Sequence, residues 1–207
     1  MQPAQIPTLV KKIYYSLTWD FHDHSGDIFL TFDDGPTPGI TEQVLEILKT
    51  YGALASFFCI GRNAERNPEL VRRISAEGHT IGNHTYSHLN GLKTNNRDYF
   101  NDIELAQTLI RSGLFRPPYG MIRPSQVRFL RTLFTIIMWD VMSYDYDAHV
   151  TKEKCLGNVL KNVSPGSIVV FHDSLKASEK VLFALPGVLE FLKEKKYKCS
   201  AIKAGMA

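Results

Sequence analysis

The chain is predicted to be an α/β protein built round a parallel sheet. Short apolar runs alternate with amphipathic, helix-like segments along all 207 residues, an order typical of repeated strand–helix units. No low-complexity linker and no repeat of fixed period interrupts this alternation. A chain of this length can bury roughly 70–75% of the surface that it exposes when unfolded, so the pattern indicates one domain with one core.

Seven apolar runs are the expected strands, and they cover residues 28–33, 55–60, 79–83, 114–117, 135–141, 167–172 and 198–202. Between them, apolar residues recur at the helical period in residues 41–51, 68–77, 98–112, 124–133, 151–163 and 178–196. The last segment contains Pro186-Gly187, which we expect to break or kink the helix because proline removes a backbone hydrogen bond.

Polar clusters follow five of the expected strands, which end at residues 33, 83, 117, 141 and 172. In a barrel the carboxyl ends of all strands surround one active site. An open, doubly wound sheet would instead gather the site at a single switch point in the strand order. The spread of the clusters over five strand ends therefore favours a barrel.

The charge and cysteine content exclude some kinds of partner and site. The formal net charge is +3 and the pI about 8.7, with lysine and arginine mixed among aspartate and glutamate. Because no basic stripe stands out, nucleic acid is not an expected partner. Cys59, Cys155 and Cys199 form no CxxC pair and no zinc-ribbon spacing, so we expect free thiols.

Residues 1–26 are predicted to form an N-terminal segment that packs on the barrel of residues 27–207. Residues 9–17 present one apolar helical face beside Lys11 and Lys12, which suits a short helix packed on the domain or an interfacial membrane anchor. We see no signal peptide and no run of the roughly 20 apolar residues that span a bilayer. We therefore favour a cytoplasmic location. If a leader was removed before Met1, the sequence does not decide the compartment.

Asp33 and Asp34 follow the apolar run "IFLTF" and precede Gly35-Pro36. A DDGP sequence by itself is typical of a turn, but the buried strand before it would deliver both carboxylates to one edge of the sheet. Adjacent side chains on an extended chain point in different directions. One carboxylate can therefore bind a metal while the other faces the bound water, and these residues alone leave open which does which.

His84 and His88 stand four residues apart in "GNHTYSH" and share one side of the chain if the segment turns helically. With one carboxylate they make a ligand set that holds a divalent metal and leaves a position for water; a pair of surface histidines is the alternative. Thr85 stands where the HExxH motif has its glutamate, so the general base has to come from elsewhere, and Asp33 or Asp34 is available. Together the clusters predict a metallohydrolase.

Three more groups follow later strands. Arg116 precedes two prolines, and it can hold an aspartate ionised through a bidentate contact. The same rigid step would fix the backbone amide of Tyr119 as an oxyanion donor. His172 ends the run "IVVFH", and Asp140 or Asp145 in "WDVMSYDY" could orient its imidazole. A surface arginine and a core histidine are the alternatives.

The motifs "TFDDGP", "HTYSH", "RPPYG", "WDVMSYDY" and "VFH" occur in the order and approximate spacing of the NodB homology domain. The chain thus resembles the polysaccharide deacetylases of carbohydrate esterase family 4 over roughly residues 27–202. The resemblance implies a single-domain, distorted (β/α)7 barrel. It also implies removal of acetyl groups from sugars with the help of a divalent metal, Zn²⁺ or Co²⁺, of which we favour Zn²⁺.

The same resemblance implies a role for each matched residue. The matched metal ligands are Asp34, His84 and His88. The matched catalytic residues are Asp33 as base, His172 as general acid, Arg116 as the tether of the base, Asp145 as the support of the acid, and Tyr119 as the oxyanion donor through its amide.

Three positions depart from the family pattern. Met142 stands where a second aspartate is frequent, Tyr146 where tryptophan is usual, and Val170 where leucine is usual. None of the three removes a ligand or a proton donor. Tyr146 and Val170 resemble positions that line the acetyl-methyl pocket. Together with Tyr119, these two residues form the predicted substrate-binding set. We expect the two departures to affect acyl or substrate preference.

We therefore predict a metal-dependent hydrolase that removes acetyl groups from N-acetylated sugars of the chitooligosaccharide or peptidoglycan type. An O-acetyl esterase acting on xylan or another acetylated glycan is one alternative. A non-sugar amide hydrolase on the same scaffold and a catalytically silent carbohydrate-binding domain are the others. The expected partner is an acetylated oligo- or polysaccharide, and the sequence specifies neither the glycan nor the oligomeric state.

Overall fold

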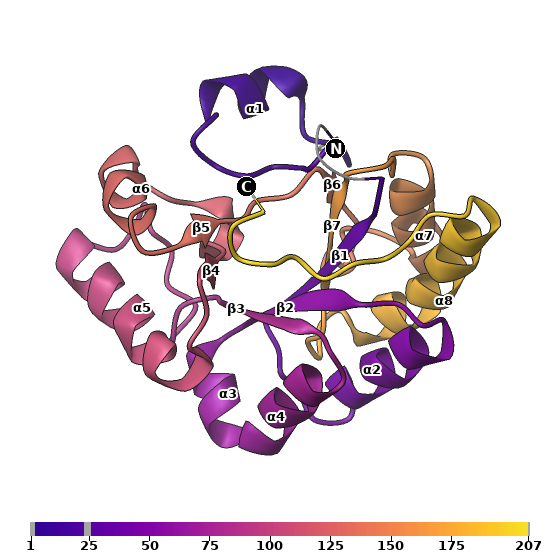
Figure 1. The fold of residues 1–207 in the computed structure, drawn as a ribbon, viewed down its shortest axis with the longest axis horizontal. Helices are drawn as coiled ribbons and strands as arrows, with labels where there is room; N and C mark the ends of the chain where they lie inside the picture. The colour runs from indigo at the N-terminus through magenta and orange to yellow at the C-terminus, as the bar shows by residue number, and fades with distance from the viewer. Residues whose placement is uncertain (1–2, 23–25, 207) are drawn as a thin grey trace.

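One curled sheet of seven parallel strands forms the frame of the molecule (Figure 1). The computed structural model describes residues 3–22 and 26–206. Its strands are β1 Phe29–Asp33, β2 Ala55–Cys59, β3 Thr80–Asn83, β4 Leu114–Phe115, β5 Thr135–Ile136, β6 Val141–Met142 and β7 Ile168–His172. They lie in the order β5-β4-β3-β2-β1-β7-β6. The prediction of a single-domain, distorted (β/α)7 barrel is confirmed.

Helices surround the outside of this sheet (Figure 1). They are α1 Thr8–Ile13, α2 Thr41–Thr50, α3 Gly61–Arg66, α4 Pro68–Ala76, α5 Asn96–Ile110, α6 Pro124–Leu130, α7 Lys152–Leu160 and α8 Ser178–Glu194, with the short turn η1 at Pro118–Gly120. Six of them match the expected helical segments. The additional helix α3 is short and largely polar, so its sequence carries no apolar period that would reveal it.

The alternation of side chains along β1 explains how the site is supplied. Leu30 and Phe32 pack in the cluster that joins the sheet to the outer helices, whereas Phe29 belongs to a separate cluster. Successive residues of a strand point to opposite faces, so Thr31 and Asp33 share the face of Phe29. Asp33 therefore ends the strand on the inner face of the barrel.

The expected strand 135–141 is in fact two strands that pair at opposite edges of the sheet. β5 pairs with β4, and β6 pairs with β7. In the link between them, the Met138 N–H donates to Thr18 and the Asp140 N–H donates to Ile168, at 2.7 and 2.9 Å. One continuous apolar run thus spans the gap between the edges, because closing a barrel requires the chain to pass from one edge to the other.

The structure contradicts the expected strand at residues 198–202 and a break of the last helix at Pro186. Residues 198–202 contribute an isolated bridge between Ile28 and Cys199 and no regular strand. The helix α8 continues through Pro186. Its buried residues lie on both sides of the proline, as with Leu185 and Val188, so tertiary packing outweighs the lost backbone hydrogen bond.

Within the described residues, the N-terminal segment lies against the barrel mainly through residues that follow its helix. Leu17, Trp19 and Phe21 are buried, whereas α1 buries none of its residues. Leu9 is 69% exposed, so the apolar face expected to pack on the domain is largely open to solvent. No helix among the described residues is long and apolar enough to cross a membrane.

Candidate active site

The two aspartates of the DDGP sequence leave β1 in different directions. Asp33 is the last residue of β1, and its register partner in β7 is His172. Asp34 has a φ of 77°, a left-handed conformation that is uncommon for a residue with a side chain. The Asn63 amide of α3 donates to the Asp34 carbonyl at 2.7 Å. This turn carries the Asp34 carboxylate to the histidines that follow β3.

Asp34, His84 and His88 converge on one point. Their candidate ligand atoms all lie within 4.8 Å of one another. Asp34 Oδ1 lies 3.7 Å from His84 Nε2 and 3.1 Å from His88 Nε2. Ligand atoms bound at about 2.0–2.1 Å in a tetrahedral site lie about 3.3 Å apart, so these separations suit a single metal ion. Three protein ligands also leave the fourth position open, as in catalytic zinc sites.

The second nitrogen of each imidazole is engaged, which leaves Nε2 facing the centre. His84 Nδ1 donates to the Arg116 carbonyl at 2.8 Å, and His88 Nδ1 lies 3.1 Å from the Tyr119 hydroxyl. Burial lowers the pKa of His84 to about 4. Burial would raise the pKa of Asp34, but the hydrogen bond with His88 and the nearby imidazoles hold it below its usual value. Neutral imidazole and ionised carboxylate are the forms that bind metals.

The chain between the two histidines is an irregular loop, so a helical turn is not what brings the two imidazoles to one side. Thr85 and His88 have φ values of 62° and 59°. Asp102 of α5 accepts from the backbone N–H groups of Tyr86 and Ser87 at 2.8 and 2.9 Å. A carboxylate from a neighbouring helix therefore shapes this loop, and the spacing of the histidines carries no signal of it.

Arg116 lies fully buried beside Asp33. Its Nη1 donates to Asp33 Oδ1 at 2.7 Å and to Thr31 Oγ1 at 2.8 Å. Its remaining N–H groups donate to the carbonyls of Ile137 and Met138. The contact with Asp33 is thus one hydrogen bond and not the expected bidentate pair, because backbone carbonyls take the other donors. Within the described residues nothing donates to Asp33 Oδ2, which is free to accept a proton.

His172 and Asp145 form a second fixed pair. The His172 side chain donates from Nδ1 to Asp145 Oδ1 at 2.8 Å, and its backbone N–H donates to Oδ2 at 2.7 Å. Burial would lower the pKa of His172, but the charge of Asp145 and its hydrogen bond outweigh this and raise it to about 9. The imidazole is therefore protonated at neutral pH, as a general acid has to be.

The three residues predicted to bind substrate lie around these groups. The Tyr119 ring is 4.5 Å from that of His88, and the Tyr146 ring meets His172 edge-on at 4.9 Å, centre to centre. Val170 is buried in β7 two residues before His172, so both share one strand face. The Tyr119 N–H makes no hydrogen bond within the described part of the chain, which leaves it available to an oxyanion.

Asp173 is a candidate that the sequence patterns did not reveal. Its buried carboxylate accepts from the Gly35 N–H at 3.1 Å and from the Thr41 hydroxyl at 2.5 Å. A Cβ on Gly35 would lie 2.0 Å from this carboxylate, so the turn needs glycine here. Burial raises the pKa of Asp173 to about 7. Through its hydrogen bonds to Gly35 and Thr41, Asp173 holds the turn that carries Asp34. Its position directly after His172 is the sequence signal that could have revealed it.

A second group of ligand-type residues lies at the amino end of the sheet. Candidate ligand atoms of Asp20, His22 and Asp140 also lie within 4.8 Å of one another. However, the Lys11 ammonium is 2.6 Å from a carboxylate oxygen of both aspartates. Asp140, one of the two candidates to orient His172, therefore lies outside the active site, and Asp145 has that contact.

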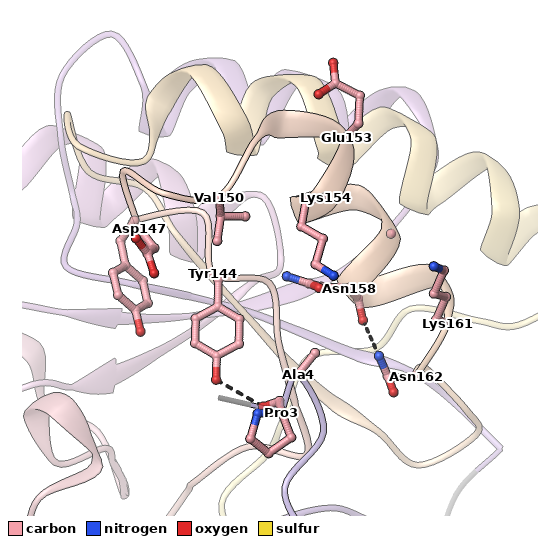
Figure 2. Close-up of a pocket in the computed structure, with 12 residues that line it drawn as sticks. Pro3, Ala4, Tyr144, Asp147, Val150, Glu153, Lys154, Asn158, Lys161 and Asn162 are labelled. Atoms are coloured by element: carbon pink, nitrogen blue, oxygen red, sulfur yellow. Dashed lines mark hydrogen bonds between the residues drawn. The ribbon is translucent and has the colours of Figure 1, made fainter. Parts of the chain in front are cut away.

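A cleft of about 420 Å³ opens beside two members of the ligand triad. It is lined by Asp34 and His88, by Asn63 and Arg66 of α3, and by Leu175 after β7, among others. A second cavity of about 630 Å³ lies between α7 and the N-terminal residues (Figure 2). There the Tyr144 hydroxyl donates to the Pro3 carbonyl at 3.0 Å. Tyr146 lines this second cavity and also contacts His172.

Comparison with known proteins identifies the family of this chain. Residues 22–133, more than half of the chain, match the family model described as polysaccharide deacetylase. The chain belongs to this family. The predicted resemblance to the NodB homology domain of carbohydrate esterase family 4 is thereby confirmed, and the chain is placed in a family of enzymes.

Curated relatives of this chain include bacterial deacetylases. A peptidoglycan-N-acetylglucosamine deacetylase of Bacillus cereus is 37% identical over 172 residues, 80% of this chain, which spans 62% of that longer protein. A second one from Bacillus cereus is 34% identical over 88% of this chain and 89% of its own. A chitooligosaccharide deacetylase of Azorhizobium caulinodans is 33% identical over 79% of this chain and 81% of its own.

Solved structures agree with this family assignment. The Bc1960 peptidoglycan N-acetylglucosamine deacetylase superposes with a TM-score of 0.87 at 32% identity, covering 95% of each chain. BA3943 of Bacillus anthracis, described as a family 4 pseudoenzyme, superposes with a TM-score of 0.76 at 26% identity, over 89% of this chain and 66% of its own. The fold by itself therefore does not guarantee turnover, and function has to be argued from the site.

Proposed function

We propose that this protein is a metal-dependent deacetylase that hydrolyses the acetamide of N-acetylated sugars. The observation that carries the proposal is the meeting of three groups at one mouth of the barrel. The groups are a ligand triad, a carboxylate held by a buried arginine, and an imidazole held by a buried aspartate. Relatives that act on peptidoglycan N-acetylglucosamine and on chitooligosaccharides support the choice of an amide of an amino sugar.

Asp34, His84 and His88 would hold the metal, and Zn²⁺ is our proposal because its catalytic sites use imidazole and carboxylate ligands. A divalent metal at this place supplies a Lewis acid and lowers the pKa of water from 15.7 to about 7. These side chains suit a cation, since the Asp34 carboxylate and the imidazoles of His84 and His88 face one centre and burial lowers the pKa of His84 to about 4.

The remaining residues divide the proton transfers between them. Asp33, whose Oδ1 accepts a hydrogen bond from Arg116, takes a proton from the attacking water through Oδ2. The Tyr119 N–H donates to the oxyanion that develops on the acetyl carbonyl, and one such donor contributes about 3–4 kcal/mol in transition-state stabilisation. His172 gives its Nε2 proton to the departing amine while Asp145 stabilises the imidazolium.

Acetate release from N-acetylglucosamine oligomers tests the proposal. We expect no release from metal-stripped protein, recovery with Zn²⁺ or Co²⁺, and one metal bound per chain by calorimetry. Release that is undiminished by metal removal would contradict the proposed metal dependence. Tight metal binding without any release from N-acetylated sugars would contradict the proposed substrate.

An O-acetyl esterase is the second candidate, favoured by the similarity to a family 4 carbohydrate esterase of Streptomyces lividans with a TM-score of 0.78 at 29% identity, over 86% of this chain and 93% of its own. An alcohol leaves with less help from an acid than an amine does. His172→Ala should therefore reduce amide hydrolysis much more than ester hydrolysis. Parallel assays on acetylated xylan and chitooligosaccharides distinguish the two activities.

A further inference from the structure

Helix α1 turns a cation towards the protein and apolar residues towards solvent, the reverse of the usual arrangement of a surface helix. The Lys11 ammonium is 2.6 Å from a carboxylate oxygen of both Asp20 and Asp140. Leu9 and Ile13 are 69% and 61% exposed, and the helix buries none of its residues. Ion pairs therefore fix α1 on the domain, and these two aliphatic side chains remain in solvent.

A groove of about 710 Å³ lies between α1 and α6. Ile13 of α1 and Tyr15 of the following turn line one side, and Val127 of α6 lines the other. Gly120 and Met121, which directly follow the predicted oxyanion donor, line it as well. Both helices lie at the upper edge of the molecule in Figure 1. The exposed side of α1 thus continues into an apolar groove that adjoins the active-site loop.

The charged side chains of this groove are cations. Arg128 and Arg131 line it, and no acidic residue is among the described residues that do so. Both arginines are exposed, and neither forms an ion pair within the described part of the chain. The bias extends along the sequence, since residues 105–139 contain five arginines and neither aspartate nor glutamate. The groove therefore attracts anions.

An anionic lipid surface suits this combination better than a glycan or a second copy of the chain does. Bound glycan hydroxyls need polar partners, but no carboxylate or carboxamide side chain is among the described residues that line the groove. Two copies related by a two-fold axis would bring Arg128 and Arg131 of one against the same arginines of the other. A bilayer with anionic lipids accepts both apolar side chains and cations.

We propose that α1 and the groove beside α6 bind the surface of an anionic lipid bilayer. Ile13, Tyr15 and Met121, all exposed, enter the boundary between headgroups and acyl chains, a depth at which tyrosine is enriched. Arg128 and Arg131 bind the lipid phosphates. Because the groove adjoins the active-site loop, the bound protein has its catalytic residues beside the membrane.

Sedimentation with vesicles tests the proposal. Wild type should sediment with phosphatidylcholine vesicles that contain about 30% phosphatidylglycerol, much less with phosphatidylcholine alone, and less as salt screens the charges. Arg128→Gln with Arg131→Gln should weaken the binding by about 30-fold, which is about fivefold per charge. Ile13→Ser with Tyr15→Ser should weaken it by about tenfold, because less apolar surface enters the bilayer.

Two matched double variants serve as controls. Lys154→Gln with Lys161→Gln removes two exposed cations from α7, and Leu105→Ser with Leu109→Ser removes two exposed leucines from α5. Neither pair lines the groove, so neither should change vesicle binding. Equal losses in the controls and in the groove variants, or no sedimentation of wild type at low salt, would overturn the proposal.

Two further measurements distinguish the other occupants. We expect a monomer by analytical ultracentrifugation and a wild-type KM for chitotetraose in both groove variants. A dimer that Ile13→Ser with Tyr15→Ser dissociates, in place of vesicle binding, would assign the groove to a second copy. A raised KM in place of lost vesicle binding would assign it to the glycan, and either result would overturn the proposal. Vesicle binding needs no substrate, so it decides this inference even if the proposed deacetylase activity fails.

Discussion

Among the residues that the structure describes, two groups of three histidines and aspartates bring their ligand atoms together, and one of the two has the features of an active site. Asp34, His84 and His88 meet at the carboxyl end of the sheet, whereas Asp20, His22 and Asp140 meet at its amino end. In the second place the ammonium of Lys11 already lies between the two carboxylates.

The surroundings of the two clusters also differ. At the carboxyl end, separate hydrogen bonds fix the two imidazoles, and a base and an acid stand nearby. At the amino end, Ser167 donates to Asp140 at 2.7 Å, and the contacts tie the N-terminal segment to the sheet. Ligand-type residues in contact therefore define a candidate metal site only when no cation of the chain neutralises them.

The largest expected effect comes from removing one histidine from each place. His84→Ala should abolish metal binding and acetate release together, because two protein ligands rarely hold a catalytic metal. His22→Ala, the matched change at the amino end, should retain one metal per chain and the wild-type rate. Metal content by mass spectrometry and acetate release check both variants. Metal loss in His22→Ala would reverse our assignment of the two clusters.

Removing a carboxylate that is not a ligand should separate chemistry from metal binding. Asp33→Asn should lower kcat by about 10²–10⁴-fold, the usual contribution of a general base, with the metal still bound. Asp20→Asn serves as the control and should leave kcat unchanged. A wild-type rate for Asp33→Asn would show that the proton goes to another group.

The amino-end cluster should matter for stability instead. Lys11→Met leaves Asp140 fully buried without its cation, and breaking a buried charge pair from one side costs about 3–5 kcal/mol. Because Lys11 and Asp20 are partly exposed, we expect about 2–4 kcal/mol less free energy of unfolding. Denaturant unfolding measures this change, while kcat per folded molecule should stay the same. An unchanged midpoint would contradict a structural role for this cluster.

The smallest expected effect is a shift in pH dependence. The pKa of His172 is raised to about 9, so the acid is present at neutral pH and is lost as pH rises through about 9. Asp145→Asn removes the charge that raises this pKa, and the alkaline limb of kcat/KM should move down towards the ordinary value of about 6.5. Asp147→Asn, on the same loop, should leave the limb in place. A limb that does not move in Asp145→Asn would exclude His172 as its origin.

Much of the candidate site could be predicted because strand ends in a parallel α/β fold converge. The apolar run before Asp33 and the run before His172 are local signals, and their parallel pairing brings the two ends together. Asp102 could not be predicted in this way, and the position of Asp173 directly after β7 does not reveal what its carboxylate contacts. Their carboxylates act on backbone N–H groups of distant loops, and such contacts leave no periodic trace in the sequence.

The amino-acid sequence by itself determined the class of fold, most of the helices, and the strand ends at which the chemistry is placed. Hydrophobic periodicity and turn residues are local properties, so they specify elements without their partners. Tertiary structure alone decided that residues 135–142 divide between two sheet edges, that Arg116 gives Asp33 a single hydrogen bond, and that Lys11 neutralises the second cluster. Register and burial set these outcomes, because they depend on which distant groups compete for the same donors and acceptors.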